Sequence, residues 1–432
     1  MVSDKFRHQL RQEIQKWEAE GLITAELSAQ LALRYEFRDL ERTARNRFVM
    51  ILIGLGSILL GLAVITFVAA NWQVWSRELK VVLLMSLFAG ANIAGFYLWR
   101  DPAEGWRSLL GKGLLLLGGL ILGANLALMS QMFHQSGPVY QLYLVWGLGV
   151  VTMAYSLRLT LLAILAVILT AIGYTWGIQD LLTPGSGFFQ LVLEHMPLLA
   201  SFLFLPLAYW CDSSWLFGLG TVLAIFSFQT NLIVNLEDFH PLSGVMAAIA
   251  SVVVPAILWA QVDLPFHKLA RNLAILFLGI LFYLFSFNFI WESSPSLTGD
   301  DISWHSGWLI LVDAFVFFAF ALFSWWRLVF RRRLDLTSAA IGIMIVITGF
   351  LVWWQVSVDA TKASATVIFN LFLFLLAVGL VRSALFSGKR RGFWGGIVLI
   401  VLQLFSRMVE KDRAKALRRK GTQLSYDYGT NS

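Results

Sequence analysis

The sequence is poor in cysteine and in charge. Its 432 residues include one cysteine, Cys211, and only 14% of them are Asp, Glu, Lys or Arg, against about 25% in soluble proteins. A single cysteine excludes an intramolecular disulfide and a zinc site built from several cysteines. The low charge argues against two or three soluble domains, which the length alone would permit.

Short catalytic and phosphate-binding motifs are missing as well. The glycines of Gly54–Gly56 and Gly118–Gly119 lie inside apolar runs and are not followed by Lys-Ser or Lys-Thr, so neither marks a phosphate loop. No two histidines have the spacing of a metalloprotease motif, and no Ser–His–Asp arrangement can be inferred. The sequence therefore assigns no catalytic residue and no cofactor.

Apolar runs separated by short polar loops fill residues 48–405, and 58% of the whole chain is hydrophobic. A helix needs about 20 such residues to cross a hydrocarbon core about 30 Å thick. The sequence predicts an all-α polytopic membrane protein with about 12–13 transmembrane helices, the last being the short run Phe393–Phe405. The other runs are Phe48–Ala70, Val81–Trp99, Leu114–Phe133, Tyr140–Leu157, Leu159–Trp176, Met196–Trp210, Trp215–Leu232, Leu242–Trp259, Leu273–Ile290, Trp308–Trp325, Leu336–Trp354 and Ala365–Leu385.

The basic residues sort onto alternate loops. If the N-terminus is cytoplasmic, the inner segments hold 23 Lys and Arg, the outer loops hold 3 and the C-terminal tail holds 7. Such an excess on the inner side orients membrane proteins. The net charge of +7 then indicates contact with anionic lipid headgroups rather than nucleic acid. We expect a multi-pass protein of the bacterial plasma membrane with a cytoplasmic N-terminus.

The polar start of the chain predicts a small cytosolic unit. Apolar residues repeat at helical spacing within Phe6–Trp17 and Leu27–Tyr35, with Gly21 suited to the turn and Thr24 to a helix cap. Residues 1–40 should form a helical hairpin with Trp17 and Leu27 packed between the helices. The second helix can continue through Arg38–Arg47 into the bilayer, and the polar start makes the first span an uncleaved insertion signal.

Three parts of the chain follow from this division. Residues 1–47 are the hairpin and a basic juxtamembrane segment, residues 48–405 the transmembrane domain, and residues 406–432 a basic polar tail. Thirteen helical residues reach only about 20 Å, so Phe393–Phe405 should be interfacial, re-entrant or marginally inserted. The tail should be cytoplasmic and disordered from Lys415.

Polar residues inside the apolar runs are the candidates for function. Asp313 is the one acid well inside a run, where a carboxylate is costly and typical of a proton or cation site. Alternatively, it lies about one and a half turns past Trp308 and reaches water or a nearby serine. Amides in or beside the runs either bridge helices or line a transport path. Asn125, Gln131, Asn288 and Asn370 are the main amide candidates, and Asn71, Asn92, Asn231 and Gln229 share the pattern.

The outer loops gather histidines and acids. Four of the six histidines lie there with nine Asp and Glu residues, and the four are His134, His195, His240 and His305. Histidine with carboxylates can bind a divalent metal or respond to pH. The alternative is that loops lacking Lys and Arg are acidic without binding anything.

A run of small residues predicts close helix packing. Gly119, Gly123 and Ala127 recur every four residues and form a small-xxx-small face. Such a face brings two helices together within one chain or in two copies. We expect packing within this chain.

Several stretches together resemble a known family. They include Glu20–Thr24, Ala69–Trp72 and Gln131–Leu142 followed by Trp146. They are similar to the bacterial predicted-membrane-protein family called domain of unknown function 2157, densely over residues 8–160 and diffusely beyond. The resemblance implies a multi-pass membrane protein with a short cytosolic N-terminal domain, and it implies no activity. Phe405–Asp412 resembles the family's approach to a last apolar helix, yet the chain is polar and basic from Arg413.

Three functions of different classes fit these features. The first is a permease- or channel-like protein for a small solute or ion, supported by the span count, the amides and Asp313. The second is a non-transporting envelope scaffold or sensor whose residues 1–40 bind a cytosolic partner. The third is an intramembrane lipid-modifying enzyme that uses the outer histidines and acids. The first is the preferred hypothesis.

Overall fold

The chain is all-α. The computed structural model describes the backbone of residues 4–35, 37–71, 75–100, 105–134, 137–181, 187–234, 243–261, 264–292, 308–331, 335–358, 362–388 and 390–429. Side chains are described for these residues except 4–8, 37–47, 68, 71, 292, 308–309, 358, 362–363 and 412–429. Seventeen helices and no strand occur in these ranges, which confirms the predicted fold class.

Most of the helices could span a membrane. By length and composition, eleven of those described could do so singly, and α8 (Phe188–Glu194) with α9 (Met196–Trp210) could form a twelfth span bent by 72°. The eleven are α3 (Phe37–Asn71), α4 (Arg77–Arg100), α5 (Trp106–Met132), α7 (Thr160–Leu181), α10 (Ser214–Val234), α11 (Ser243–Ala260), α12 (His267–Phe285), α14 (Trp308–Phe330), α15 (Leu336–Val358), α16 (Lys362–Ser387) and α17 (Arg390–Gly429). The predicted polytopic architecture is therefore confirmed.

Two predicted spans are not among these eleven: Met196–Trp210, which is α9 of the bent pair, and Tyr140–Leu157. Residues 140–157 lie in the 19-residue helix α6 (Val139–Leu157), which is short and carries Gln141 and three tyrosines. These polar groups lower its apolar content. The short helix α13 (Asn288–Glu292) follows α12.

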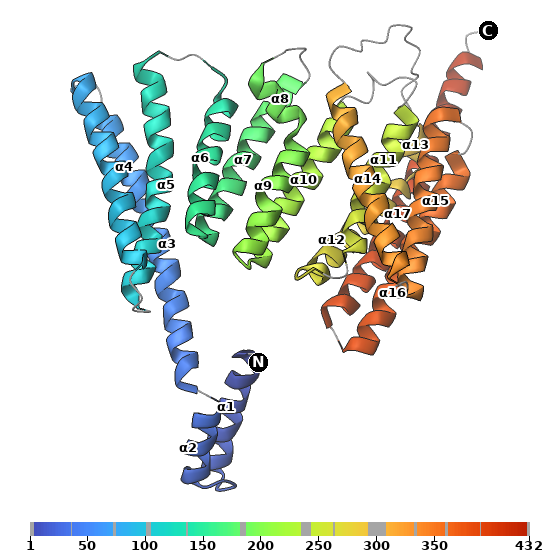
Figure 1. The fold of residues 1–432 in the computed structure, drawn as a ribbon. Helices are drawn as coiled ribbons and strands as arrows, with labels where there is room; N and C mark the ends of the chain where they lie inside the picture. The colour runs from blue at the N-terminus through green and yellow to red at the C-terminus, as the bar shows by residue number, and fades with distance from the viewer. Residues whose placement is uncertain are drawn as a thin grey trace. The chain divides into compact units, whose positions relative to one another are not determined.

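The chain divides into two compact units, residues 1–173 and 174–432. In the first, Figure 1 shows α1 (Asp4–Ala19) and α2 (Ala25–Arg34) side by side as the predicted hairpin. Gly21 has a φ of +71°, and Thr24 Oγ1 accepts the backbone N–H of Leu27 at 3.4 Å. The turn and the cap therefore form as predicted.

The core of the hairpin differs from the prediction. Ile14 is buried, and Leu10, Ile23 and Leu31 are among the residues packed against it. Trp17 and Leu27 are instead 37% and 44% exposed, so their predicted packing between the helices is wrong. The second helix also does not continue into the bilayer. It ends at Arg34, and the separate helix α3 begins at Phe37.

The small residues of α5 pack within the chain, as predicted. The indole N–H of Trp146 on α6 donates to the Gly119 carbonyl at 2.7 Å. A Cβ added at Gly123 would lie only 2.2 Å from the same indole ring. Glycine is needed there because α6 places an aromatic ring directly on the α5 backbone.

The C-terminal helix is longer than predicted. In place of an apolar segment ending at Phe405 and a disordered tail, α17 is one helix from Arg390 to Gly429, and Arg390–Lys411 is long and apolar enough to cross a membrane. The argument from a thirteen-residue length is therefore wrong. An interfacial position for Phe393–Phe405 and a cytoplasmic tail stay predictions.

Polar contacts accommodate Arg407 within the apolar part of α17. Its guanidinium donates to the Ser286 carbonyl at the C-terminal end of α12 and forms an ion pair with Glu410 at 2.9 Å. Glu410 also accepts the backbone N–H of Asn288. Cations are favoured at helix C-termini, so these contacts offset part of the cost, about 2.5–3.5 kcal/mol, of placing an arginine at the centre of a membrane.

Candidate functional site

The candidate site in the second unit pairs the half-buried His195 with a buried aspartate, Asp313. His195 lies at the junction of α8 and α9, and Asp313 lies in the second turn of α14. His195 Nδ1 is 2.6 Å from Asp313 Oδ1, slightly shorter than the about 2.7–2.9 Å of a typical charge-assisted N–H···O bond. Asp313 is 1% exposed. It therefore pairs with a histidine, and the alternative in which it reaches water or a serine does not describe the structure.

One oxygen of this carboxylate has no partner. Asp313 Oδ2 is buried and makes no hydrogen bond to any residue that the structure describes. Buried polar atoms almost always have a partner, and the exceptions need an explanation. A free carboxylate oxygen beside an imidazole can accept a proton or contact a cation.

The helix break that places His195 has a local cause. Pro197 lies in the first turn of α9, where it lacks the N–H that a helix continuing from α8 would need. Proline is tolerated at the start of a new helix. The chain therefore ends α8 at Glu194, turns at His195 and starts α9 in a direction 72° away.

An amide and a phenol hold the broken end. Asn231 on α10 donates its side-chain N–H groups to the carbonyls of Leu193 and Glu194 at 3.1 and 2.7 Å. Tyr174 donates to Asn231 Oδ1 at 2.7 Å. The last carbonyls of a helix lack intrahelical partners, and Asn231 supplies them here. This support fixes the backbone directly before His195.

A second acid lies beside the pair. Glu194 is buried, hydrogen-bonds Gln190, and interacts electrostatically with both His195 and Asp313. The site thus holds two carboxyl groups and one imidazole. No group of three or more His, Cys, Asp and Glu residues in the described ranges could hold a metal ion.

Of the three other predicted outer-face residues, the structure describes one. His134 is exposed and follows α5 in the first unit. His240 and His305 lie outside the described residues.

The predicted amides serve other helix contacts. Asn125 donates to the Leu84 carbonyl at 3.3 Å, and Asn370 donates to the carbonyls of Ser286 and Thr366 at 3.2 and 2.7 Å. Asn288 Oδ1 accepts from the Thr366 hydroxyl at 3.5 Å. Gln131 is exposed. These contacts fit the helix-bridging interpretation.

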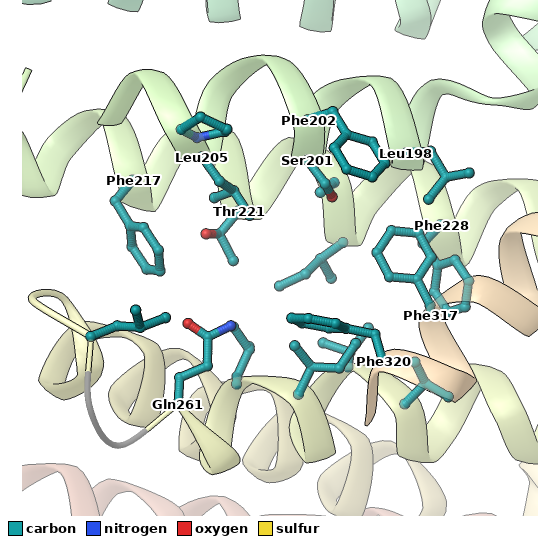
Figure 2. Close-up of a pocket in the computed structure, with 18 of the residues that line it drawn as sticks. Leu198, Ser201, Phe202, Leu205, Phe217, Thr221, Phe228, Gln261, Phe317 and Phe320 are labelled. Carbon is teal, nitrogen blue, oxygen red and sulfur yellow. The ribbon is translucent and has the colours of Figure 1, made fainter. Parts of the chain in front are cut away.

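A cavity of about 800 Å³ lies between α9, α10, α11 and α14 (Figure 2). Leu198 and Val316 line it, and each lies one helical turn after His195 or Asp313 on the same helix. Phe228 of α10 and Phe317 of α14 meet edge to face with centroids 5.1 Å apart. The pair and the cavity are therefore adjacent, and aromatic rings line the end of the cavity nearer the pair.

A second polar cluster fixes the far end of α11. Trp259 donates its indole N–H to Ser338 Oγ at 3.0 Å, and the Arg271 guanidinium lies 5.2 Å from the Trp259 ring. Asp335 accepts the Ser338 backbone N–H at 3.1 Å. Burial raises the pKa of Asp335, but hydrogen bonds from the Ser338 side chain and backbone and the nearby Arg271 bring it below its usual value. Gln261, two residues after Trp259, is thereby held at the cavity.

Residues 15–163 match the family described as "Predicted membrane protein (DUF2157)". The expected resemblance is thus confirmed from the last residues of α1 through the helices that follow it, up to the start of α7. The family description gives a membrane location and no activity. No curated protein and no solved structure matches the chain.

The matched region ends before the candidate site. Neither His195 nor Asp313 lies within it, so their role is argued from geometry alone. Reasoning from the sequence selected both residues but not their pairing, and it did not select Tyr174 at all. Two features of the sequence could have indicated this site. Pro197 follows the polar residues Glu194 and His195 closely, and Tyr174 lies inside an apolar run.

Proposed function

We propose that this membrane protein is a permease-type protein that moves protons, alone or with a small solute, through the His195–Asp313 pair. The observation that carries the proposal is a buried carboxylate, bonded to a histidine at a helix break, with one oxygen left without a partner. Ionisable groups inside membrane proteins are costly and commonly form proton pathways. Broken helices in transporters commonly carry the ion site.

The pair can change its charge without a change of fold. Histidine is the side chain that most readily gains and loses a proton near neutral pH. With a proton on the imidazole, the pair is internally neutral; without it, the pair carries the charge of the carboxylate. Oδ2 of Asp313 offers a second acceptor beside the first, so a proton can pass between neighbouring groups.

Proton flux into vesicles tests this role. The full-length protein is placed in liposomes that contain a pH-sensitive dye, and a potassium gradient with valinomycin drives proton entry. Wild-type vesicles should acidify faster than empty ones, and Asp313→Asn should remove most of the difference because it removes the carboxylate.

Asp212→Asn is the matched control. Asp212 is also an acid of the second unit, but it is exposed and lies in the turn after α9 with a φ of 46°, which asparagine tolerates. It should leave the flux unchanged. Wild-type vesicles no faster than empty ones would contradict proton movement without a solute, and equal flux in the Asp313 variant would contradict the role of the pair.

We also propose that the N-terminus is cytoplasmic and that the membrane is the bacterial plasma membrane. The sorting of Lys and Arg supports this orientation, and the inner basic residues should contact anionic lipid headgroups. Reporter fusions after Arg45, Lys268 and Arg332 should report cytoplasm. Fusions after Gly185 and Gly299 should report the outside, and two or more reversed reporters would overturn the orientation.

A second candidate function rests on the hairpin. Leu22 and Leu33 are among its exposed apolar side chains, and a partner protein could cover them. A scaffold or sensor that binds a cytosolic protein would use this surface. Such a protein needs no proton flux, so the vesicle experiment separates the two functions.

A further inference from the structure

The cavity beside the pair is built almost entirely from apolar side chains. Phenylalanines from α9, α10 and α14 form much of its wall, and those labelled in Figure 2 are Phe202, Phe217, Phe228, Phe317 and Phe320. Its volume of about 800 Å³ falls in the usual range of about 300–1,000 Å³ for ligand pockets. A hydrocarbon chain suits such a wall better than a polar solute does.

One buried hydroxyl on this wall has an unmet hydrogen bond. Thr221 of α10 is 5% exposed, and its Oγ1 has no partner among the residues that the structure describes. Buried hydroxyls in helices commonly bond the carbonyl four residues earlier, as Ser201 and Thr348 do here at 2.8 and 2.7 Å. Thr221 is therefore available to a ligand.

Gln261 provides a second polar group. Figure 2 shows the Thr221 hydroxyl and the Gln261 amide projecting into the cavity from opposite walls. A hydroxyl and an amide can each donate and accept hydrogen bonds. Together they can bind one small polar group placed between them.

The cavity excludes a charged ligand. None of its lining residues is Asp, Glu, Lys or Arg. A carboxylate or ammonium group brought into such surroundings would lose its hydration without gaining a counter-charge. The polar group of the ligand must therefore be uncharged, such as a hydroxyl or an ester carbonyl.

The bilayer is the natural source of the ligand. Phe202 and Phe320 line the cavity and are also strongly exposed on membrane-spanning helices, so the cavity opens where lipid chains lie. We propose that it binds an uncharged single-chain amphiphile, a long-chain alcohol or monoacylglycerol, with its chain along the phenylalanines and its polar group on Thr221 and Gln261. This inference does not depend on the proton role of His195 and Asp313.

Photolabelling of the full-length protein tests the proposal. The probe is a hexadecanol analogue that carries a diazirine, applied to the protein in lipid nanodiscs and read out by mass spectrometry of the labelled peptides. Wild-type protein should be labelled on α10 and α14. Excess unlabelled hexadecanol or monoacylglycerol should compete, whereas palmitate at pH 8 and phosphatidylethanolamine should not.

Three variants locate the site. Ala224→Phe fills the cavity from α10, where Ala224 is part of the lining, and should nearly abolish labelling. Thr221→Val keeps the side-chain shape but removes the hydroxyl, and should lower labelling about fivefold, as loss of one hydrogen bond predicts. Val222→Phe is the control, because Val222 is on the same helix but 51% exposed and outside the lining.

The outcomes separate this site from general lipid contact. Equal labelling of wild type and Thr221→Val, or equal competition by palmitate, would overturn the recognition of an uncharged polar group. Competition by phosphatidylethanolamine alone would show an ordinary lipid contact and overturn the proposal. If Ala224→Phe fails to fold, judged by its elution and thermal unfolding, Thr221→Val and the competitors still decide.

Discussion

His195→Ala should destabilise the protein strongly, by about 3–5 kcal/mol, because it leaves the Asp313 carboxylate buried without its partner. The carboxylate is 1% exposed, and one of its oxygens already lacks a hydrogen bond. Removing the imidazole would leave the other oxygen, Oδ1, without the partner seen here. Unfolding of the full-length protein in mixed micelles, followed by circular dichroism as SDS is added, measures the loss.

The companion variant should have a much smaller effect. Asp313→Asn keeps the shape of the side chain and replaces a charged hydrogen bond by a neutral one, a difference of about 1 kcal/mol. The sign of its effect on stability should also depend on whether His195 is present. Added to His195→Ala, the same substitution should restore stability, because it removes the unpaired charge.

This reversal of sign would distinguish an ion pair from a histidine that only fills space. A histidine that acted only by filling space would give the same loss whether residue 313 is Asp or Asn. Additive effects of the two substitutions would therefore show that the bond between His195 and Asp313 contributes nothing particular to stability. A double variant more stable than His195→Ala alone would support an ion pair.

The sequence predicted this site only in part, and the reason is physical. Charge sorting along the loops predicted His195 on the outer side, and hydropathy predicted Asp313 inside an apolar run. Their pairing joins residues 118 positions apart, and it depends on which helices are neighbours. Hydropathy sets the number of spans but carries almost no information about their order around a bundle.

The C-terminal helix α17 is a second case in which the sequence alone did not predict a contact between helices. A single arginine at position 407 argues against insertion when each residue is weighed alone. The structure pairs it with Glu410 one turn away and with the end of α12. The first partner could be read from the sequence as an i, i+3 pair, whereas the second requires the packed fold.

Gly111→Ala should disrupt the packing of α4 against α5, with a loss of stability of about 3 kcal/mol. A Cβ added at Gly111 would lie 2.3 Å from the backbone nitrogen of Trp99 and 2.8 Å from the carbonyl oxygen of Gly95. Both neighbours are backbone atoms of α4, which cannot rotate away as a side chain can. The two helices must separate, and the packing along the rest of their contact is then lost.

Gly90→Ala is the matched control, and its effect should have the opposite sign. Gly90 lies on α4 itself, and a Cβ there would meet no atom within 4 Å. Alanine at a compatible helical position stabilises by about 0.4–1 kcal/mol through the unfolded chain. Thermal unfolding of the detergent-solubilised protein should therefore rank Gly90→Ala at or above wild type and Gly111→Ala far below it. Equal losses in both variants would show that glycine matters in these helices for some reason other than close backbone contact.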